Sequence, residues 1–122
     1  NIIDFKKSIE ESDIIMISSP EYNHSLPGVL KNAIDWGSRN KNSFSGKSTV
    51  IFGVSNGNYG TIRMQFHMRQ ILAALNVYVE PQPQVFIGNG NNIFDSNGNI
   101  TDSKIVEQLT KLIESTIKNF KQ

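Results

Sequence analysis

The chain has 122 residues, no cysteine, 38% hydrophobic residues and a formal net charge of +1, which together fit one globular domain without an electrostatic footprint for nucleic acid. The lack of cysteine excludes disulfides and thiolate sites, and no apolar segment approaches the ~20 residues that span a bilayer. We therefore expect a soluble, cytoplasmic protein with neither nucleic-acid nor membrane partners.

The first part of the chain changes from a helical to a strand pattern and back again. Apolar residues recur at helical spacing over residues 2–9, whereas residues 14–17 are apolar at every position. A run of that second kind is typical of a parallel strand covered on both faces. Ser25 is then a candidate N-cap, Pro27 suits a first helical turn, and an apolar face predicts a helix ending near Gly37.

The same alternation continues to the end of the chain. Residues 47–55 predict a second strand, and an apolar stripe over residues 64–75 predicts a helix. Residues 77–87 read as a third strand that two prolines kink or place at an edge. Residues 88–102 are too rich in glycine and asparagine for regular structure, and residues 102–118 predict a closing helix.

This αβαβαβα order predicts an α/β fold, a three-layer parallel sheet with helices on both faces. Ligands in such sheets bind outside the carboxyl ends of the strands. Those ends are the turns that begin at Ser18, Val54 and Ile87, and two of them have unusual sequences. We therefore expect any ligand-binding residues at these turns.

The first turn reads SPEYNHS. Its proline fixes one φ angle, Tyr22 offers a flat amphipathic ring, and the Asn23 side chain both donates and accepts hydrogen bonds. Such a set suits a planar ligand with polar edges. The simpler alternative is a strand-to-helix turn in which asparagine or serine caps the helix.

The second turn, SNGNYGTIR, follows a predicted strand and precedes a predicted helix. It spaces Ser55, Gly57, Gly60 and Arg63 as S-x-G-x-x-G-x-x-R. Glycines let the backbone approach a ligand, and amides at a helix N-terminus favour carbonyls or anions. The turn is neither a dinucleotide-binding G-x-G-x-x-G motif nor a phosphate-binding Walker A loop.

Together, the two turns resemble those of the NADPH-dependent FMN reductases, the flavodoxin-like quinone, azo-dye and chromate reductases. The resemblance is nearly continuous from Ser19 to Trp36, and the second turn falls where that family has its second flavin loop. It implies that the first turn packs beside the isoalloxazine and ribityl portions of FMN and that the second contacts the ring's pyrimidine edge. The cofactor-binding residues implied in this way are Pro20, Glu21, Tyr22, Asn23, Ser55, Gly57, Asn58 and Gly60.

The sequence departs from that family at two places. The family opens with a strand and a loop that cradles the FMN phosphate, and neither lies within these 122 residues. We therefore expect residues 1–122 to form a single partial domain, with strands three to five of a 2-1-3-4-5 sheet and one unpaired edge on the strand at residues 14–18. Where the family usually has a second glycine beside Gly60, this chain has Thr61.

The resemblance implies an FMN-dependent NAD(P)H oxidoreductase that passes hydride from a nicotinamide through FMN to a quinone, an azo compound or a similar acceptor. It also implies a homodimer or homotetramer. No catalytic side chain is expected, because the flavin carries the chemistry. The alternative is a truncated, non-catalytic α/β fragment that acts at most as a flavin-binding or interaction module.

Several side chains stay outside this assignment. His24 is read as a cap or surface residue, and Arg63 as a partner for a nicotinamide phosphate or, preferably, for a second subunit. No metal site is expected, since the chain has two histidines and no cysteine. The segment 95–99 is read as a tight turn instead of a calcium loop. Trp36 either covers the core or lies at a subunit interface.

Overall fold

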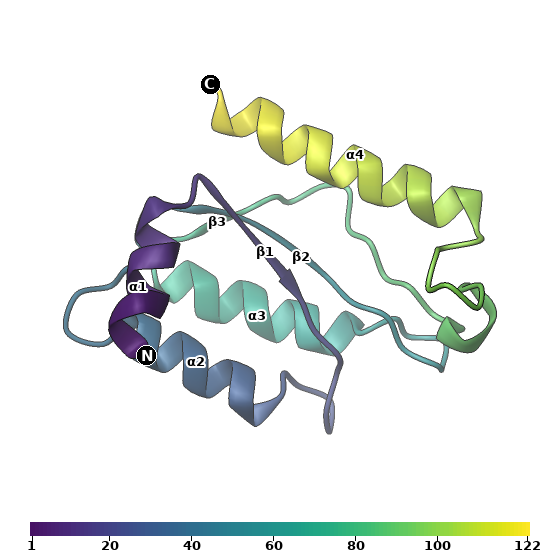
Figure 1. The fold of residues 1–122 in the computed structure, drawn as a ribbon, viewed down its shortest axis with the longest axis horizontal. Helices are drawn as coiled ribbons and strands as arrows, with labels where there is room; N and C mark the ends of the chain where they lie inside the picture. Colours follow the sequence, from purple (N-terminus) through teal and green to yellow (C-terminus); the bar gives the residue numbers. More distant parts are fainter.

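The computed structural model describes all residues from 1 to 122, and its elements alternate as the sequence predicts (Figure 1). The helices and strands are α1 (Ile2–Glu11), β1 (Ile14–Ser18), α2 (Gly28–Ser38), β2 (Ser48–Phe52), α3 (Ile62–Ala74), β3 (Tyr78–Val79), the 3₁₀ helix η1 (Gly90–Asn92) and α4 (Ser103–Phe120). The predicted αβαβαβα order is confirmed. None of the helices is long and apolar enough to cross a membrane.

The three strands form one parallel sheet in the order β1-β2-β3. β1 pairs with β2 along its whole length, from Ile14 opposite Ser48 to Ser18 opposite Phe52. β3 is only two residues long because the prolines that follow cannot donate to a ladder. Pairing resumes farther on in a single bridge between Val54 and Ile87. The strand predicted over residues 77–87 is therefore much shorter than expected, and its predicted edge position is confirmed.

Helices cover both faces of the sheet (Figure 1). One face packs against α1, α2 and α3, whose apolar stripes bury Ile9, Ile34 and Met68 with Ile51 of β2. The other face packs against α4, where Leu112 meets the opposite side of β2. The α/β prediction is confirmed, because β2 contacts helices on both faces, through Ile51 on one and Val50 on the other. The prediction that residues 14–17 are covered on both faces is met only in part, since Met16 of β1 is 54% exposed.

One local prediction is wrong. Ser25 does not cap α2: the N-cap is Pro27, which provides no side-chain cap, and the Ser25 hydroxyl lies 2.8 Å from Nδ1 of His67. In α4 the polar Thr116 is buried together with Leu112, while Ile117 is 39% exposed. Thr116 is accommodated because its hydroxyl donates to the Leu112 carbonyl at 2.8 Å, so no polar group is left unpaired.

β1 is an edge strand, with β2 on one side and no strand on the other. Met16 at the middle of this edge is 54% exposed. An apolar cavity of about 280 Å³ lies beside it, between α1, β1 and α2, with Phe5, Leu30 and Phe44 among its walls. The expected unpaired edge of this strand is therefore present in the structure.

Candidate functional site

The turns that follow β1 and β2 meet at the carboxyl end of the sheet. Ser19 donates its backbone N–H to the Phe52 carbonyl at 3.2 Å, which continues the β1–β2 ladder into the first turn. A Cβ atom on Gly53 would lie 2.3 Å from the Ser19 carbonyl oxygen and 2.6 Å from Oγ1 of Thr61. Only glycine fits at the point where the first turn, β2 and the start of α3 come together.

The first turn is closed by a pair of backbone hydrogen bonds between Tyr22 and Ser25, at 2.9 and 3.0 Å. The two residues between them, Asn23 and His24, have φ angles of 49° and 68°. Positive φ at both central positions is the mark of a type I′ turn, which asparagine tolerates well. This turn directs Tyr22 outward, and its side chain is 58% exposed.

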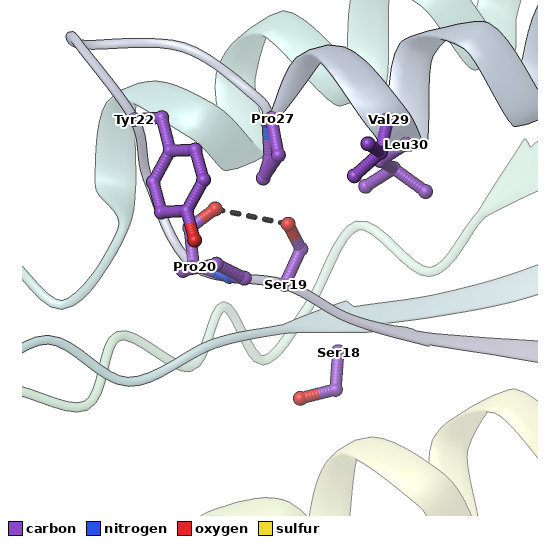
Figure 2. A pocket seen from close by; sticks show the side chains of 7 residues that line it. All are labelled: Ser18, Ser19, Pro20, Tyr22, Pro27, Val29 and Leu30. Carbon is purple, nitrogen blue, oxygen red and sulfur yellow. Dashed lines mark hydrogen bonds between the residues drawn. The ribbon is translucent and has the colours of Figure 1, made fainter.

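A shallow cavity of about 390 Å³ lies beside the exposed tyrosine ring, and Figure 2 shows the residues around it. Its walls are the side chains of Ser18, Ser19, Pro20, Tyr22, Pro27, Val29 and Leu30. Figure 2 also marks a hydrogen bond from the Ser19 hydroxyl to the Pro20 carbonyl at 2.9 Å. Since most of the wall is apolar, the cavity suits the flat or aliphatic part of a ligand.

Glu21 turns its carboxylate away from this cavity and towards α3. Oε1 accepts the backbone N–H of Met64 at 2.8 Å, and Oε2 accepts from Nε and Nη2 of Arg63 at 2.7 and 2.6 Å. Burial alone would raise the pKa of Glu21, but the Met64 amide and the Arg63 guanidinium outweigh it and hold the pKa below its ordinary value. The carboxylate is therefore ionised and fully engaged near neutral pH.

The rest of the first turn also contacts α3. Nη1 of Arg63 donates a hydrogen bond to Nε2 of His24 at 3.0 Å, and the guanidinium carbon of Arg63 lies 4.8 Å from the centre of the Tyr59 ring. Arg63 thus pairs inside the chain, and its expected contact with a nicotinamide phosphate or a second subunit stays a prediction. Its guanidinium joins the first turn to the end of the second.

In the second turn, Ser55 and Gly60 face the protein. The Ser55 hydroxyl accepts the N–H of Gly60 at 3.0 Å and donates to the Gly57 carbonyl at 3.3 Å. Gly60 is buried at φ 55°, and a Cβ atom there would lie 2.5 Å from Ile87 N and Phe86 C. These two predicted site residues close the turn and seat it on the segment that leads into Ile87.

The middle of the second turn faces outward with its backbone N–H groups unpaired. None of the N–H groups of residues 56–59 donates to another protein atom, and all four residues are exposed. A Cβ atom on Gly57 would meet no atom within 4 Å. Because backbone donors seek partners, this stretch is suited to a ligand edge that carries acceptor atoms.

Thr61 follows this turn as the N-cap of α3, at φ 67°. A β-branched residue at positive φ is strained, and the position would suit a glycine better. Gln65 holds it in place, since its Nε2 donates to Thr61 Oγ1 at 3.1 Å in a buried contact. The side chain is therefore occupied inside the helix and leaves the α3 amides without a local cap.

The loop after Ile87 forms the back of the second turn, which the sequence reasoning missed. Asn89 donates to the Gly57 carbonyl and Gly90 to the Ser55 carbonyl, each at 2.9 Å. Gly88 packs so closely that a Cβ atom would lie 2.8 Å from the Gly57 carbonyl oxygen. The signal was available in the G-N-G spacing directly after a predicted strand, the same kind of signal that marked the second turn.

The geometry thus brings the eight sequence-predicted residues to one end of the sheet but divides their roles. Tyr22 and Pro20 border the cavity, and Gly57 and Asn58 offer free backbone donors. The side chains of Glu21 and Ser55 and the backbone of Gly60 are committed to internal contacts. The outward-facing part fits a flat ligand with an acceptor-rich edge.

Comparison with known proteins supplies a second line of evidence, which does not depend on the geometry of the site. The family model described as NADPH-dependent FMN reductase matches residues 1–92. An NAD(P)H-dependent FMN reductase of Pseudomonas aeruginosa is 42% identical over 112 residues, which cover 91% of this chain and 60% of that protein. A 2-hydroxy-1,4-benzoquinone reductase of a Burkholderia species is 43% identical over 98 residues, covering 79% and 54%.

Among solved structures, the flavoenzyme FerB of Paracoccus denitrificans, an NAD(P)H:(acceptor) oxidoreductase, superposes with a TM-score of 0.89 at 30% identity. The match covers 98% of this chain and 67% of FerB. The prediction of a flavodoxin-like parallel α/β fold is confirmed. The chain spans little more than half the length of the curated relatives it matches.

Proposed function

Because this chain belongs to the NADPH-dependent FMN reductase family, we propose that it binds FMN and takes part in NAD(P)H-dependent reduction of a small-molecule acceptor such as a quinone or an azo compound. The names of its relatives, an FMN reductase and a benzoquinone reductase, support this class of reaction. No catalytic side chain is assigned. The proposed site lies at the turns after β1 and β2.

One observation carries the proposal: exposed and unpaired N–H groups at residues 56–59 lie on the turn adjacent to the one that exposes Tyr22. An isoalloxazine ring has carbonyl and ring-nitrogen acceptors on one edge and a flat apolar body. Donors on one turn and an aromatic and proline surface on the other match those two properties.

We propose that FMN is bound by residues of both turns. Tyr22 and Pro20 contact the flat body of the flavin, and the backbone at Gly57 and Asn58 donates to its edge. When bound, FMN supplies the hydride and electron transfer, so no side-chain acid or base is required in these turns. Ser55, Gly60 and Glu21 keep the two turns in shape.

A homodimer or homotetramer and a cytoplasmic location complete the proposal. An exposed aromatic surface next to the second turn supports association: Phe66 is 47% exposed, and the centre of its ring lies 6.2 Å from that of Phe86. The absence of cysteine fits a reducing compartment. Sedimentation velocity measures the first property and cell fractionation the second.

The decisive experiment is an FMN titration followed by flavin fluorescence and by the visible absorption spectrum. We expect quenching that saturates at one FMN per chain, and NADPH oxidation that depends on both FMN and an added quinone. A titration with no saturable change, at FMN concentrations where the protein stays folded by circular dichroism, would overturn the proposal for this chain.

The open edge of β1 favours a second candidate, a non-catalytic interaction module. Met16 is exposed there beside the apolar cavity between α1 and α2. An unpaired parallel strand is a template for pairing with another chain. This candidate predicts colourless protein without NADPH oxidation, and oligomers that disperse when Met16 is replaced by lysine.

A further inference from the structure

We propose that Glu21 is a positioning residue that fixes the first turn against the second by capping helix α3 from outside that helix. This role rests on the proposed function, because it concerns how the two turns are kept ready for one ligand. It assigns the Glu21 carboxylate to α3 and not to the flavin.

The first reason is that α3 needs a cap and has none of its own. Its N-cap residue, Thr61, makes no side-chain hydrogen bond to the amides of the first turn of the helix. These amides are unsatisfied in any helix unless a side chain, water or ligand accepts from them. Glu21 accepts from Met64, the third residue of α3, at 2.8 Å, where an ordinary N-cap side chain would bond.

The second reason is that both carboxylate oxygens are used. Oε1 accepts from Met64 while Oε2 accepts from two nitrogens of Arg63, at 2.7 and 2.6 Å. The Glu21 side chain is only 9% exposed. A negative charge at a helix N-terminus is also favoured by the helix dipole. No oxygen of this group is free for a ligand.

The third reason is that α3 continues directly from the second turn. Residues 56–59 are followed by Gly60 and Thr61, and α3 begins at Ile62. A carboxylate from the first turn that holds the first residues of α3 therefore restrains both turns at once. His24 and Ser25 add contacts to Arg63 and His67 in the same direction, at 3.0 and 2.8 Å.

The consequence is preorganisation. The N–H groups of residues 56–59 have no protein partners, and the middle of the turn is held through the Gly57 carbonyl, which accepts from Asn89 and Ser55. The positions of the donors therefore depend also on how firmly the ends of the turn are fixed. A site whose parts are already in place loses less freedom when it binds a ligand. Removing Glu21 should loosen the second turn although Glu21 is not in it.

The experiment compares Glu21→Ala with Glu10→Ala by NMR, without flavin. Glu10 is a matched control because it also accepts a hydrogen bond, from Ser43 at 2.9 Å, and pairs with a cation, Lys41 at 3.2 Å. We expect hydrogen exchange of the Met64 amide to rise by about tenfold or more in Glu21→Ala only. We also expect ¹⁵N relaxation to show greater motion at residues 56–59 in that variant only.

A conservative variant separates capping from simple loss of structure. Glu21→Gln keeps an oxygen for the Met64 amide but loses the charge that pairs with Arg63, so Met64 should stay protected while the Arg63 side chain becomes mobile. Equal Met64 exchange and equal order of residues 56–59 in Glu21→Ala and Glu10→Ala would overturn the inference.

A flavin titration of the same proteins is the second arm. We expect FMN affinity to fall by about tenfold in Glu21→Ala and to stay unchanged in Glu10→Ala. If the unmodified chain binds no FMN, the proposed function fails, while the exchange data still decide whether Glu21 fixes the turn.

Discussion

The turn after β1 exposes a side chain to solvent, whereas the turn after β2 exposes its backbone. In the first turn, the Glu21 side chain bonds to the Met64 amide of α3, and the Tyr22 side chain is exposed to solvent. In the second turn, the Ser55 side chain bonds to the Gly60 amide, and the backbone at Gly57 is exposed to solvent. One turn offers a surface, and the other offers donors.

This difference shows why neither turn is sufficient as a ligand site. An exposed aromatic ring binds flat molecules with little selectivity, and a row of free amides binds acceptors of many shapes. Placed side by side by Gly53 and Glu21, the two select a ligand that is flat and has acceptors on one edge. The predictions below test each side of that division, beginning with the largest expected effect.

Gly60→Ala should destabilise the fold most, by about 3 kcal/mol, because it adds a Cβ atom at positive φ into contact with Phe86 and Ile87. Urea unfolding measures the loss. Gly98→Ala is the matched control, since Gly98 also has positive φ but open space around it. If both variants lost the same stability, the close seating of the second turn would be wrong.

Tyr22→Ala should weaken FMN binding by about tenfold, the effect of losing one aromatic contact, and change stability by less than about 0.5 kcal/mol. Fluorescence titration and urea unfolding measure the two quantities. Tyr78→Ala serves as the control because Tyr78 is 45% exposed but lies at the amino end of the sheet. Unchanged affinity in Tyr22→Ala would remove the first turn from the site.

The stabilising effect of Glu21 should depend on pH. Since its pKa is lowered in the folded protein, the unfolded chain takes up the proton more readily, and the ionised carboxylate stabilises the fold above its ordinary pKa of about 4.3. The contribution is lost as pH falls through the lowered folded value. Near neutral pH, Glu21→Gln should therefore be less stable than the unmodified chain by about 1 kcal/mol.

In more acidic solution this gap should close, as measured by thermal unfolding across a pH series. The Arg63→Gln variant should reduce the same pH dependence, since Arg63 is one of the groups that lower the pKa of Glu21. A stability difference that stays constant through the acidic range would show that the charge of Glu21 contributes nothing.

Gly57→Ala should have the smallest effect. Its φ lies outside the positive range and no atom lies within 4 Å of where a Cβ atom would stand, so stability should change by less than about 1 kcal/mol, with either sign. FMN affinity should nevertheless fall a few-fold, because the added methyl group stands where the ligand edge approaches. An unaltered titration curve would place the ligand elsewhere on the turn.

The order of the elements could be predicted because buried residues form a local pattern of apolar positions in the sequence. Ile15 and Ile17 of β1 pack against the cluster formed with α1, α2 and α3, and Ile14 packs against the cluster formed with α4. Met64, Met68 and Leu72 recur at helical spacing since one side of α3 is buried. The two unusual turns could be located for a similar reason. Glycine and proline at the end of a strand indicate that the backbone does not continue as a strand.

The division of roles within the turns was not visible in the sequence, because it depends on contacts between distant residues. Glu21 and Met64 are 43 positions apart, and nothing near Glu21 indicates that its partner is a backbone amide. Ser25 has the right residue type for a cap, but the tight turn from Tyr22 directs it to His67 instead. Nor did the sequence show that Gly60 packs against Phe86 and Ile87.

Gly53 has a practical consequence for anyone who redesigns this region. The Ser19 carbonyl and the Thr61 hydroxyl occupy the space that a side chain at position 53 would need. The two turns can therefore lie this close together only because residue 53 has a hydrogen atom in place of a side chain. A library meant to admit bulkier ligands should therefore vary residues 23–24 and 56–59 in length and identity. Position 53 should be left as glycine, because every library member that changes it would push the two walls of the site apart.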